Sequence, residues 1–484
     1  MGQQVGSSLA EKLLLVWYRW SSGYLSVPLE HMQTEIVRPV AERRLAGRAL
    51  RKIVPRSLHA DWKAPANRPD PIDILIESGR HRIADLLPIR YERMRSSPFA
   101  FMRGAAAVMA ADLAATPSTG LWVQASGDCH MANFGTFASP EGTPVFDVND
   151  FDETLPAPFE WDLKRLAASF AVNALSRKLD ARSARGLART AIMSYRIHMQ
   201  ELAKLEPLVS WRSRIDVIGL LEGIEDPRMR EREFRRLQTA TEASNAGYPR
   251  LIERTRGGWR IKARPPVLVP LSGQHDDTHE RVARTAFDSY KMSLPEERRI
   301  LLDRYELHDV AFKVVGIGSV GTFCAIGLYA TADNHTLLLQ LKEAQKSVLA
   351  RYVGSSIYAN QGQRVVVGQR IMQTLPDMFL GWTDDPRDDQ QCYVRQFKDS
   401  RLALIGSDLS EGALIYFATL CGLTLARAHA RSADAARIAG YLGSGGAFDA
   451  AIASFAMAYA AQTESDWRLF LDAIKSGLIQ AGGA

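Results

Sequence analysis

Residues 309–343, DVAFKVVGIGSVGTFCAIGLYATADNHTLLLQLKE, form the stretch that decides how this chain is expected to fold. Three runs rich in β-branched, aromatic and aliphatic residues are separated by a glycine-rich turn and by TADN, whose Asp and Asn favour turns. This pattern predicts an antiparallel meander of three strands. Helical patterns at 97–115, 161–201 and 411–480 surround it, together with two isolated strand-like runs, LWVQA at 121–125 and CYVRQFK at 392–398. The sequence therefore predicts an α+β protein.

The glycine-rich turn of this meander, Gly316-Ile317-Gly318-Ser319-Val320-Gly321, has the spacing G-x-G-x-x-G. In a dinucleotide-binding protein the same string opens a helix. Here it is followed by TFCAIGLYA at 322–330, which is typical of a strand. A glycine string between two strands indicates instead a loop that covers the phosphates of a nucleotide.

Lys342 lies inside the last strand of the meander. The chain has only 13 lysines in 484 residues, and a buried strand accepts lysine poorly without an anionic partner. The phosphates of a nucleotide are one such partner, and a lysine that extends from the strand end into water is the alternative. No acidic residue occurs at 344–375, so no helical glutamate is available to pair with Lys342. Gln361, Gln363 or Gln369 could orient it instead.

A dense polar cluster lies much earlier in the chain, in GDCHMANFG at 127–135 and VFDVNDFDE at 145–153. Its polar members are Asp128, His130, Asn133, Asp147, Asn149, Asp150, Asp152 and Glu153. Carboxylates packed this closely repel one another, and a bound divalent cation offsets that repulsion. A surface acidic loop is the alternative, but the flanking Val, Phe and Trp residues are not typical of a solvated turn.

The first string of this cluster resembles the GDxHxxN catalytic loop of aminoglycoside and choline kinase-like enzymes. Asp150-Phe151-Asp152 resembles the metal-binding Asp-Phe-Gly position of the same enzymes, and Asp162 of WDLKR resembles the helix opening that follows it. The resemblance implies that Asp128 is the base or orienter of the acceptor. It also implies that Asn133 and Asp150 bind magnesium.

The candidate site residues fall into three groups, and ATP and magnesium are the expected cofactors. The catalytic group is Asp128, His130 and Lys342; the nucleotide-binding group is Gly316, Gly318, Ser319, Gly321 and Lys342; the metal group is Asn133, Asp150 and Asp152. Arg103 and Arg395 are either clamps for phosphate or members of structural ion pairs.

The order of these motifs is reversed relative to the kinases they resemble, in which the nucleotide-covering lobe comes first. The sequence thus predicts a bilobal, circularly permuted protein-kinase-like fold, with a small antiparallel β-rich lobe and a larger, mainly helical lobe. The expected parts are a helical extension at 1–50, the helical lobe with both polar loops at 51–310, the nucleotide-covering lobe at 311–400, and helices completing the helical lobe at 401–484. The glycine-rich half and the carboxylate half of the site must contact the phosphates of one nucleotide. Lys342 should therefore lie on the order of 10 Å or less from the Asp150 carboxylate.

Longer stretches of the chain resemble the bacterial domain-of-unknown-function family 2252. The shared strings are RMRSSPFAFMRG, GDCHMANFG, FDVNDFDE, WDLKRLAAS, KVVGIGSVGT, LQLKEA, GQRIMQ and RQFKDS. They extend over about residues 50–480. This resemblance implies homology and leaves the activity to be inferred from the residues.

Composition argues against several other classes of protein. The net charge of +6 comes from 47 arginines and 13 lysines that are scattered, whereas a nucleic-acid footprint requires a concentrated basic face. No run of about 18 apolar residues occurs, so we expect no membrane span and a cytoplasmic location. The four cysteines are far apart, which indicates reduced thiols.

The function expected from these patterns is an ATP- and magnesium-dependent transferase that moves a phosphoryl or nucleotidyl group to an acceptor that the sequence does not identify. A nucleotide-binding pseudokinase that acts as a regulatory module is one alternative, because the helical glutamate is missing. A metal-dependent phosphoesterase is another, because GDCH resembles a metallophosphatase string.

Overall fold

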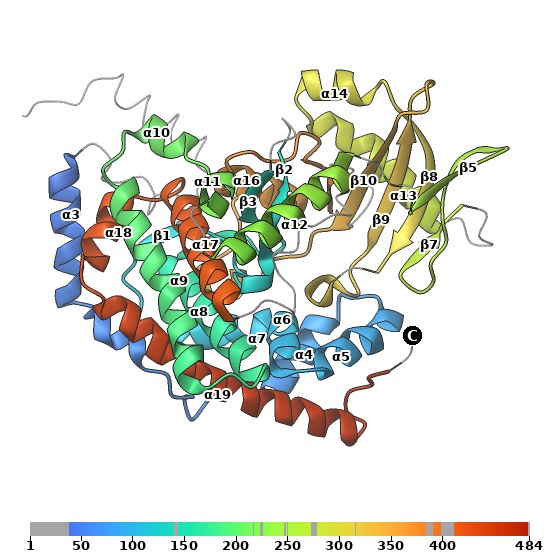
Figure 1. Cartoon of the computed structure of the whole chain (residues 1–484). Coiled ribbons are helices and arrows are strands. Elements are labelled where there is room, and N and C mark those ends of the chain that lie inside the picture. Colours follow the sequence, from blue (N-terminus) through green and yellow to red (C-terminus); the bar gives the residue numbers. More distant parts are fainter. Residues whose placement is uncertain are drawn as a thin grey trace, which may run out of the picture.

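The computed structural model of the chain describes residues 38–482 except 140–143, 216, 223–225, 246–247, 249, 273–277, 315, 384–390 and 398–410. Most of the predicted extension at 1–50 therefore lies outside the described residues. The fold is α+β, as expected: most helices gather into one body, which we call the helical lobe, and a twisted antiparallel sheet with its covering helices forms the other, the β lobe (Figure 1).

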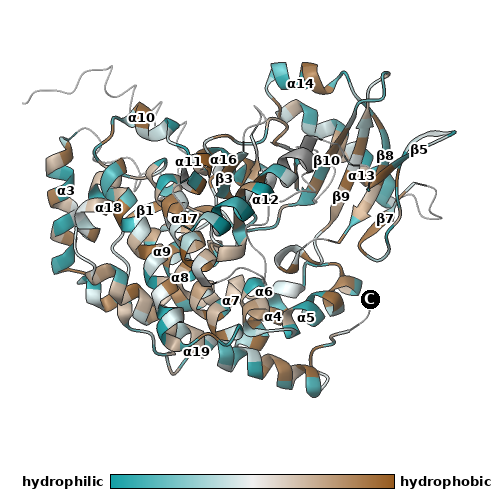
Figure 2. Ribbon diagram, in the orientation of Figure 1, coloured by the Kyte–Doolittle hydropathy of each residue, from teal (hydrophilic) through white to brown (hydrophobic). Residues whose placement is uncertain are grey.

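The helical lobe is built around four long helices whose apolar side chains share one core. They are α8 (Phe159–Ser176), α9 (Ala181–Leu202), α17 (Glu411–Ala430) and α19 (Ala447–Lys475). Helix α8 is buried along nearly all of its length, which explains why its sequence lacks a clear polar face. The outer helix α3 (Val40–Ala49) alternates hydrophobic and hydrophilic residues along its length instead (Figure 2). Helix α18 (Ala435–Leu442) packs against α3.

Four short helices complete this lobe beside the end of α19 and share a second core with it. They are α4 (Pro71–Gly79), α5 (Leu87–Arg95), α6 (Pro98–Gly104) and α7 (Ala106–Ala114). Proline occupies one of the first two positions of α4, α5 and α6, where its missing N–H costs no hydrogen bond. Asp70 and Ser97 cap α4 and α6.

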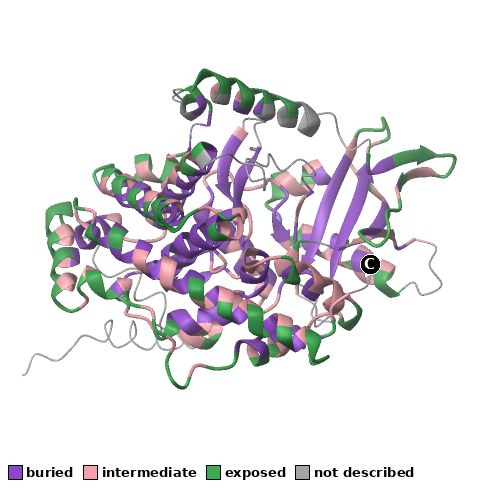
Figure 3. Cartoon of the chain, turned by 60° about the horizontal axis from the view of Figure 1, so that its bottom comes forward, coloured by how far each residue is buried: buried purple, intermediate pink, exposed green. Residues whose placement is uncertain are grey.

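The β lobe contains a six-stranded antiparallel sheet in the order β11-β12-β10-β9-β8-β7. The strands are β7 (Leu268–Pro270), β8 (Glu306–Lys313), β9 (Cys324–Ala330), β10 (Thr336–Glu343), β11 (Gly381–Trp382) and β12 (Cys392–Gln396). The predicted meander is confirmed as β8, β9 and β10, and CYVRQFK contains β12. The sheet starts well before residue 311, since β7 and most of β8 precede that position. Its central strands are buried (Figure 3).

Helices and a hairpin cover the two faces of this sheet. Helix α13 (Thr278–Ser289) packs on one face, and α14 (Glu296–Leu302) follows it. The hairpin of β5 (Ile252–Thr255) and β6 (Gly258–Ile261) packs on the other. The connecting helices are α10 (Pro207–Arg212), α11 (Val217–Glu222), α12 (Pro227–Asn245), α15 (Ala350–Val353) and α16 (Gln361–Met372).

Two small antiparallel pairs carry the polar loops between the lobes. Strand β1 (Trp122–Ala125), which confirms the predicted LWVQA strand, pairs with β4 (Leu155–Pro158). Strand β2 (Phe134–Ala138) pairs with β3 (Pro144–Val148). The loops at 126–133 and 149–154 extend from these strand pairs, so the two loops lie side by side.

One described helix, α17, is long and apolar enough at Gly412–Ala430 to cross a membrane by length and composition alone. Of the apolar window in that helix, 72% is buried inside the protein, as is typical of a core helix. All four cysteines are buried and none is in a disulfide; that their thiols are reduced stays a prediction. The cytoplasmic location stays a prediction.

Candidate functional site

The first polar loop is tied to the start of helix α8, and a glycine lets the second loop pack against it. Both oxygens of the buried Asp162 carboxylate, in the first turn of α8, accept from the loop at 126–133: Ser126 N–H donates at 2.7 Å and Gly127 N–H at 3.1 Å. Gly127 has a φ of +79°, and a Cβ there would lie 2.3 Å from the carbonyl oxygen of Glu153. Only glycine permits this close approach, which brings the second loop against the first.

Asp128 projects from the first loop and is fixed by a buried arginine of α8. Arg165 Nε donates to Asp128 Oδ1 at 2.6 Å, and its Nη2 is also in contact with that oxygen. Burial raises the pKa of Asp128, and Arg165 offsets only part of this effect. The structure thus gives Asp128 a fixed orientation and a higher proton affinity than an exposed aspartate has.

Lys342 meets the second loop at Asp152. Its Nζ lies 2.6 Å from Asp152 Oδ2 and 3.8 Å from Asp150 Oδ1, well within the expected 10 Å. Tyr393 OH donates to Asp152 Oδ1 at 2.6 Å, and Ser319 Oγ donates to Oδ2 at 2.9 Å. Burial favours the neutral form of Asp152, but Lys342 and these hydrogen bonds outweigh it and hold the carboxyl pKa well below its ordinary value.

Asp152 is therefore the anionic partner of the buried Lys342. The expectation that a glutamine orients Lys342 is wrong for the two whose side-chain hydrogen bonds are described: Gln361 accepts from Arg364, and Gln369 donates to Gln373. Burial opposes the charge on Lys342, but Asp150 and Asp152 together raise its pKa above the ordinary value.

The glycine-rich turn closes over these carboxylates. Residues Ile317–Ser319 form one short 3₁₀ turn, and a Cβ at Gly318 would lie 3.9 Å from Asp128 Oδ2. Gly321 has a φ of +92°, and a Cβ there would lie 2.9 Å from the Cβ of Arg82. Arg82 Nη1 donates to the Val320 carbonyl at 2.6 Å, so the turn is anchored to the helical lobe.

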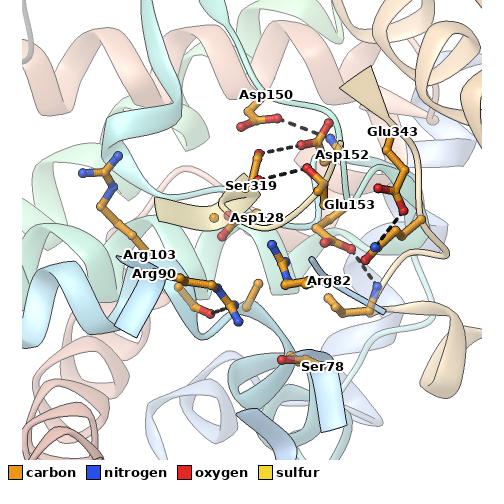
Figure 4. Close-up of a pocket in the computed structure, with 17 residues that line it drawn as sticks. Ser78, Arg82, Arg90, Arg103, Asp128, Asp150, Asp152, Glu153, Ser319 and Glu343 are labelled. Atoms are coloured by element: carbon orange, nitrogen blue, oxygen red, sulfur yellow. Dashed lines mark hydrogen bonds between the residues drawn. The ribbon is translucent and has the colours of Figure 1, made fainter. Parts of the chain in front are cut away.

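A pocket opens where the turn, the two loops and helices α4 to α7 meet (Figure 4). One wall is acidic and the other is basic, and Asp128 lies between them. The lining residues are Ser78, Arg82, Arg90, Arg103, Gly104, Ala106, Ala107, Asp128, Asp150, Asp152, Glu153, Gly318, Ser319, Thr322, Glu343, Gln345 and Val348. Lys342 lies behind Asp152 and does not line the pocket.

The three expected metal ligands differ in what their side chains do. Asn133 is buried, and its Nδ2 donates to the Asp128 carbonyl at 2.9 Å. Asp152 has both oxygens engaged, as described above. Asp150 lines the pocket with 33% of its side chain exposed.

No group of three His, Cys, Asp or Glu residues in the described part of the chain is arranged to hold a metal ion. Magnesium, however, is usually bound through one or two carboxylates together with substrate phosphates and water. Asp150 and Asp152 both line the pocket, and Asp150 fits this kind of site better because Lys342, Tyr393 and Ser319 already engage both oxygens of Asp152.

His130 is placed less favourably than the other expected catalytic residues. Its ring is buried and does not line the pocket, and its Nε2 lies 3.7 Å from Asp128 Oδ2. Burial, together with the nearby Arg103 and Arg165, lowers its pKa well below the ordinary value. His130 is therefore neutral near pH 7 and packs edge-on against Phe99.

Several polar residues of the site carried no signal that singled them out in the sequence. Arg82 and Arg90 line the pocket, yet they lie in an arginine-rich segment in which nothing distinguishes them from their exposed neighbours. Buried Arg364 donates to the carbonyl oxygens of Asp152, Thr154 and Gln345. Arg395, by contrast, was a candidate phosphate clamp from the sequence; its Nη1 donates to the Asn149 carbonyl at 3.1 Å, and it does not line the pocket.

Replacing Lys342 with methionine should destabilise the protein by about 3 kcal/mol, because it leaves the Asp152 carboxylate buried without its cation. The free energy of unfolding in denaturant measures this. Lys346→Met is the matched control, since Lys346 is exposed. Adding Asp152→Asn to Lys342→Met should restore part of the loss; a double variant no more stable than the single one would contradict the pairing.

Glu153 gives the site a pH-dependent stability. Burial raises its pKa to about 7, above the ordinary 4.5, although Val348 N–H donates to its carboxylate at 2.7 Å. The folded protein thus binds a proton more tightly than the unfolded chain, so this contribution to stability falls as pH rises from about 4.5 to 7.

Between pH 5 and pH 8, Glu153→Gln should therefore gain stability relative to the wild type by on the order of 2 kcal/mol. Denaturant unfolding at each pH measures the difference. Glu92→Gln, on the exposed face of α5, is the control. A constant difference between Glu153→Gln and wild type across this range would rule out the assignment.

Comparison with known proteins adds one finding to this geometry. The family model described as "Uncharacterized protein conserved in bacteria (DUF2252)" matches residues 82–473, which include every loop described above. No curated protein and no solved structure matched the chain.

Proposed function

Because the chain belongs to the bacterial family DUF2252, which has no described activity, we propose from its site that it is an ATP- and magnesium-dependent transferase with a circularly permuted kinase-like arrangement. The observation that carries this proposal is that Ser319 and Lys342 both contact Asp152, although they lie 167 and 190 positions from it in the sequence. A glycine turn and two carboxylate-bearing loops around one pocket, with a buried lysine behind them, are parts that phosphoryl transfer uses.

Each group of site residues has its own role in the proposed transfer. The backbone of the glycine turn covers the phosphates, and Lys342 with Asp152 fixes the position of the second loop. A magnesium ion held by Asp150 would neutralise charge on the phosphates. Asp128, oriented by Arg165, accepts the proton of the acceptor's hydroxyl or amine group. Most of the rate enhancement then comes from positioning and electrostatics.

Incubation of the full chain with γ-labelled and α-labelled ATP tests this function. Label transferred from the γ position identifies a phosphoryl transferase, and label from the α position identifies a nucleotidyl transferase. The readout includes transfer to the protein itself, to water and to acceptors of a bacterial extract. ATP that neither binds nor reacts in the presence of magnesium would contradict the proposal.

A nucleotide-binding pseudokinase is the second candidate, and one observation favours it. Lys342 is tied to Asp152 and does not line the pocket, so in this conformation its ammonium does not face a bound phosphate. Measurable ATP affinity without transfer of either label would identify this function.

We expect Lys342→Met to weaken ATP binding more than Lys313→Met or Lys346→Met does, because only Lys342 reaches the carboxylates beside the glycine turn. Isothermal titration of each folded variant with ATP and magnesium measures the affinities. Lys313 instead lies over the ring of Phe397. If Lys346→Met were the most damaging change, the lysine would have been assigned wrongly.

A further inference from the structure

The basic wall of the pocket contains three arginines that come from three different segments of the helical lobe. Arg82 lies between α4 and α5, Arg90 lies in α5, and Arg103 lies near the end of α6. All three line the pocket opposite the loop that carries Asp150 and Asp152 (Figure 4). The proposed transfer assigns no role to this wall.

Arg90 is a buried cation whose hydrogen-bonding capacity is largely unused. It is 2% exposed, and its Nη2 donates to the Gly104 carbonyl at 2.7 Å. Its Nε and Nη1 find no hydrogen-bond partner among the residues that the structure describes. Buried N–H groups of a guanidinium are normally paired, so this arrangement indicates a missing acceptor.

Arg82 adds a second guanidinium to the same wall. Its Nη1 is used by the Val320 carbonyl, while its buried Nε has no partner in the described part of the chain. Within that part, neither Arg82 nor Arg90 forms an ion pair with a carboxylate. Burial and the charge of Arg82 lower the pKa of Arg90 to about 9. An anion bound between Arg82 and Arg90 would offset both the repulsion between their charges and the cost of burying those charges.

We propose that Arg82 and Arg90 form a subsite for a phosphate group, on the wall of the pocket opposite Asp150. The planar fork of a guanidinium matches the oxygens of a phosphate, and two such forks can bind one tetrahedral group from two sides. Because Arg82 also holds the Val320 carbonyl, a phosphate bound here sits directly below the glycine turn.

This phosphate can come from two sources, and the two sources predict different experimental results. The subsite holds either a phosphate of the nucleotide or a phosphate that the acceptor already carries. The subsite itself requires neither magnesium nor transfer, so its failure can be separated from failure of the proposed function.

Calorimetric titration of the full chain with inorganic phosphate and with pyrophosphate, without nucleotide or magnesium, tests the subsite. We expect saturable binding at one site per chain. Arg90→Gln and Arg82→Gln should each weaken it at least about 10-fold, because each removes a charged pair of donors. Arg95→Gln is the matched control: it lies on α5 as well but is exposed and pairs with Glu92.

Thermal unfolding without ligand establishes which variants are folded. Arg90 also donates to the Gly104 carbonyl, so the Arg90→Gln variant can fail to fold. In that case Arg82→Gln tests the subsite alone, because it changes a different segment. Ser78→Glu keeps both arginines and adds a carboxylate to the pocket lining, so it should also lower phosphate affinity. Absence of saturable binding by the wild type, or unchanged affinity in the folded variants, overturns the subsite.

Competition with a non-hydrolysable ATP analogue distinguishes the two sources. If the analogue displaces phosphate and binds more weakly to Arg90→Gln, the subsite takes a phosphate of the nucleotide. If analogue and phosphate bind together, the subsite takes a phosphorylated acceptor. Phosphate binding by a chain that binds no nucleotide would support the subsite while contradicting the proposed transferase.

Discussion

Replacing Asp128 with asparagine should lower the rate of group transfer by about 10² to 10⁴ while ATP affinity changes little. The reason is that Asp128 is the carboxylate between the two walls of the pocket, and burial raises its pKa toward that of a useful base. Asparagine keeps an oxygen for Arg165 but cannot accept the proton. Single-turnover transfer of labelled phosphate and calorimetric ATP titration measure the two quantities separately.

Asp147→Asn is the control for this experiment. Asp147 is also a buried carboxylate paired with a buried arginine, Arg427, but it does not line the pocket. Both variants should lose similar stability, and only Asp128→Asn should lose transfer. An equal loss of ATP affinity and rate in Asp128→Asn would show that Asp128 binds the metal instead.

Asp150→Asn should abolish magnesium-dependent turnover, lowering it by more than about 100-fold, while the fold stays intact. Asp150 lines the pocket with its carboxylate partly exposed, and in the variant Lys342 keeps its closer ion pair with Asp152, so the fold should survive. Titration of ATP affinity and turnover with magnesium, beside thermal unfolding, measures both effects.

Asp303→Asn gives the matched control, because Asp303 Oδ1 lies 3.6 Å from Lys291 Nζ on the surface, at nearly the separation of Asp150 and Lys342. It should change neither turnover nor its magnesium dependence. If Asp150→Asn kept the magnesium dependence of the wild type, the metal assignment would be wrong, and Asp152 would be the next residue to examine.

The sequence predicted the elements whose signals are local. The meander of β8, β9 and β10 is confirmed, because strand propensity, apolar runs and turn residues all lie within one stretch of chain. The loops around Asp128 and Asp150 were identified for the same reason. The edge strands β7 and β11 were not predicted, since runs of three and two residues have no period to detect.

By itself, then, the sequence determined an α+β chain with a glycine-rich turn between strands, a strand that carries a buried lysine, and two loops that carry carboxylates. Only the tertiary structure decided which groups meet: that Asp152 pairs with Lys342 from 190 positions away, that Asp150 lines the pocket, and that Arg82 and Arg90 form its other wall. The physical reason is that strands and turns depend on neighbours in the chain. The partner of a buried charge depends instead on which distant segments exclude water from it.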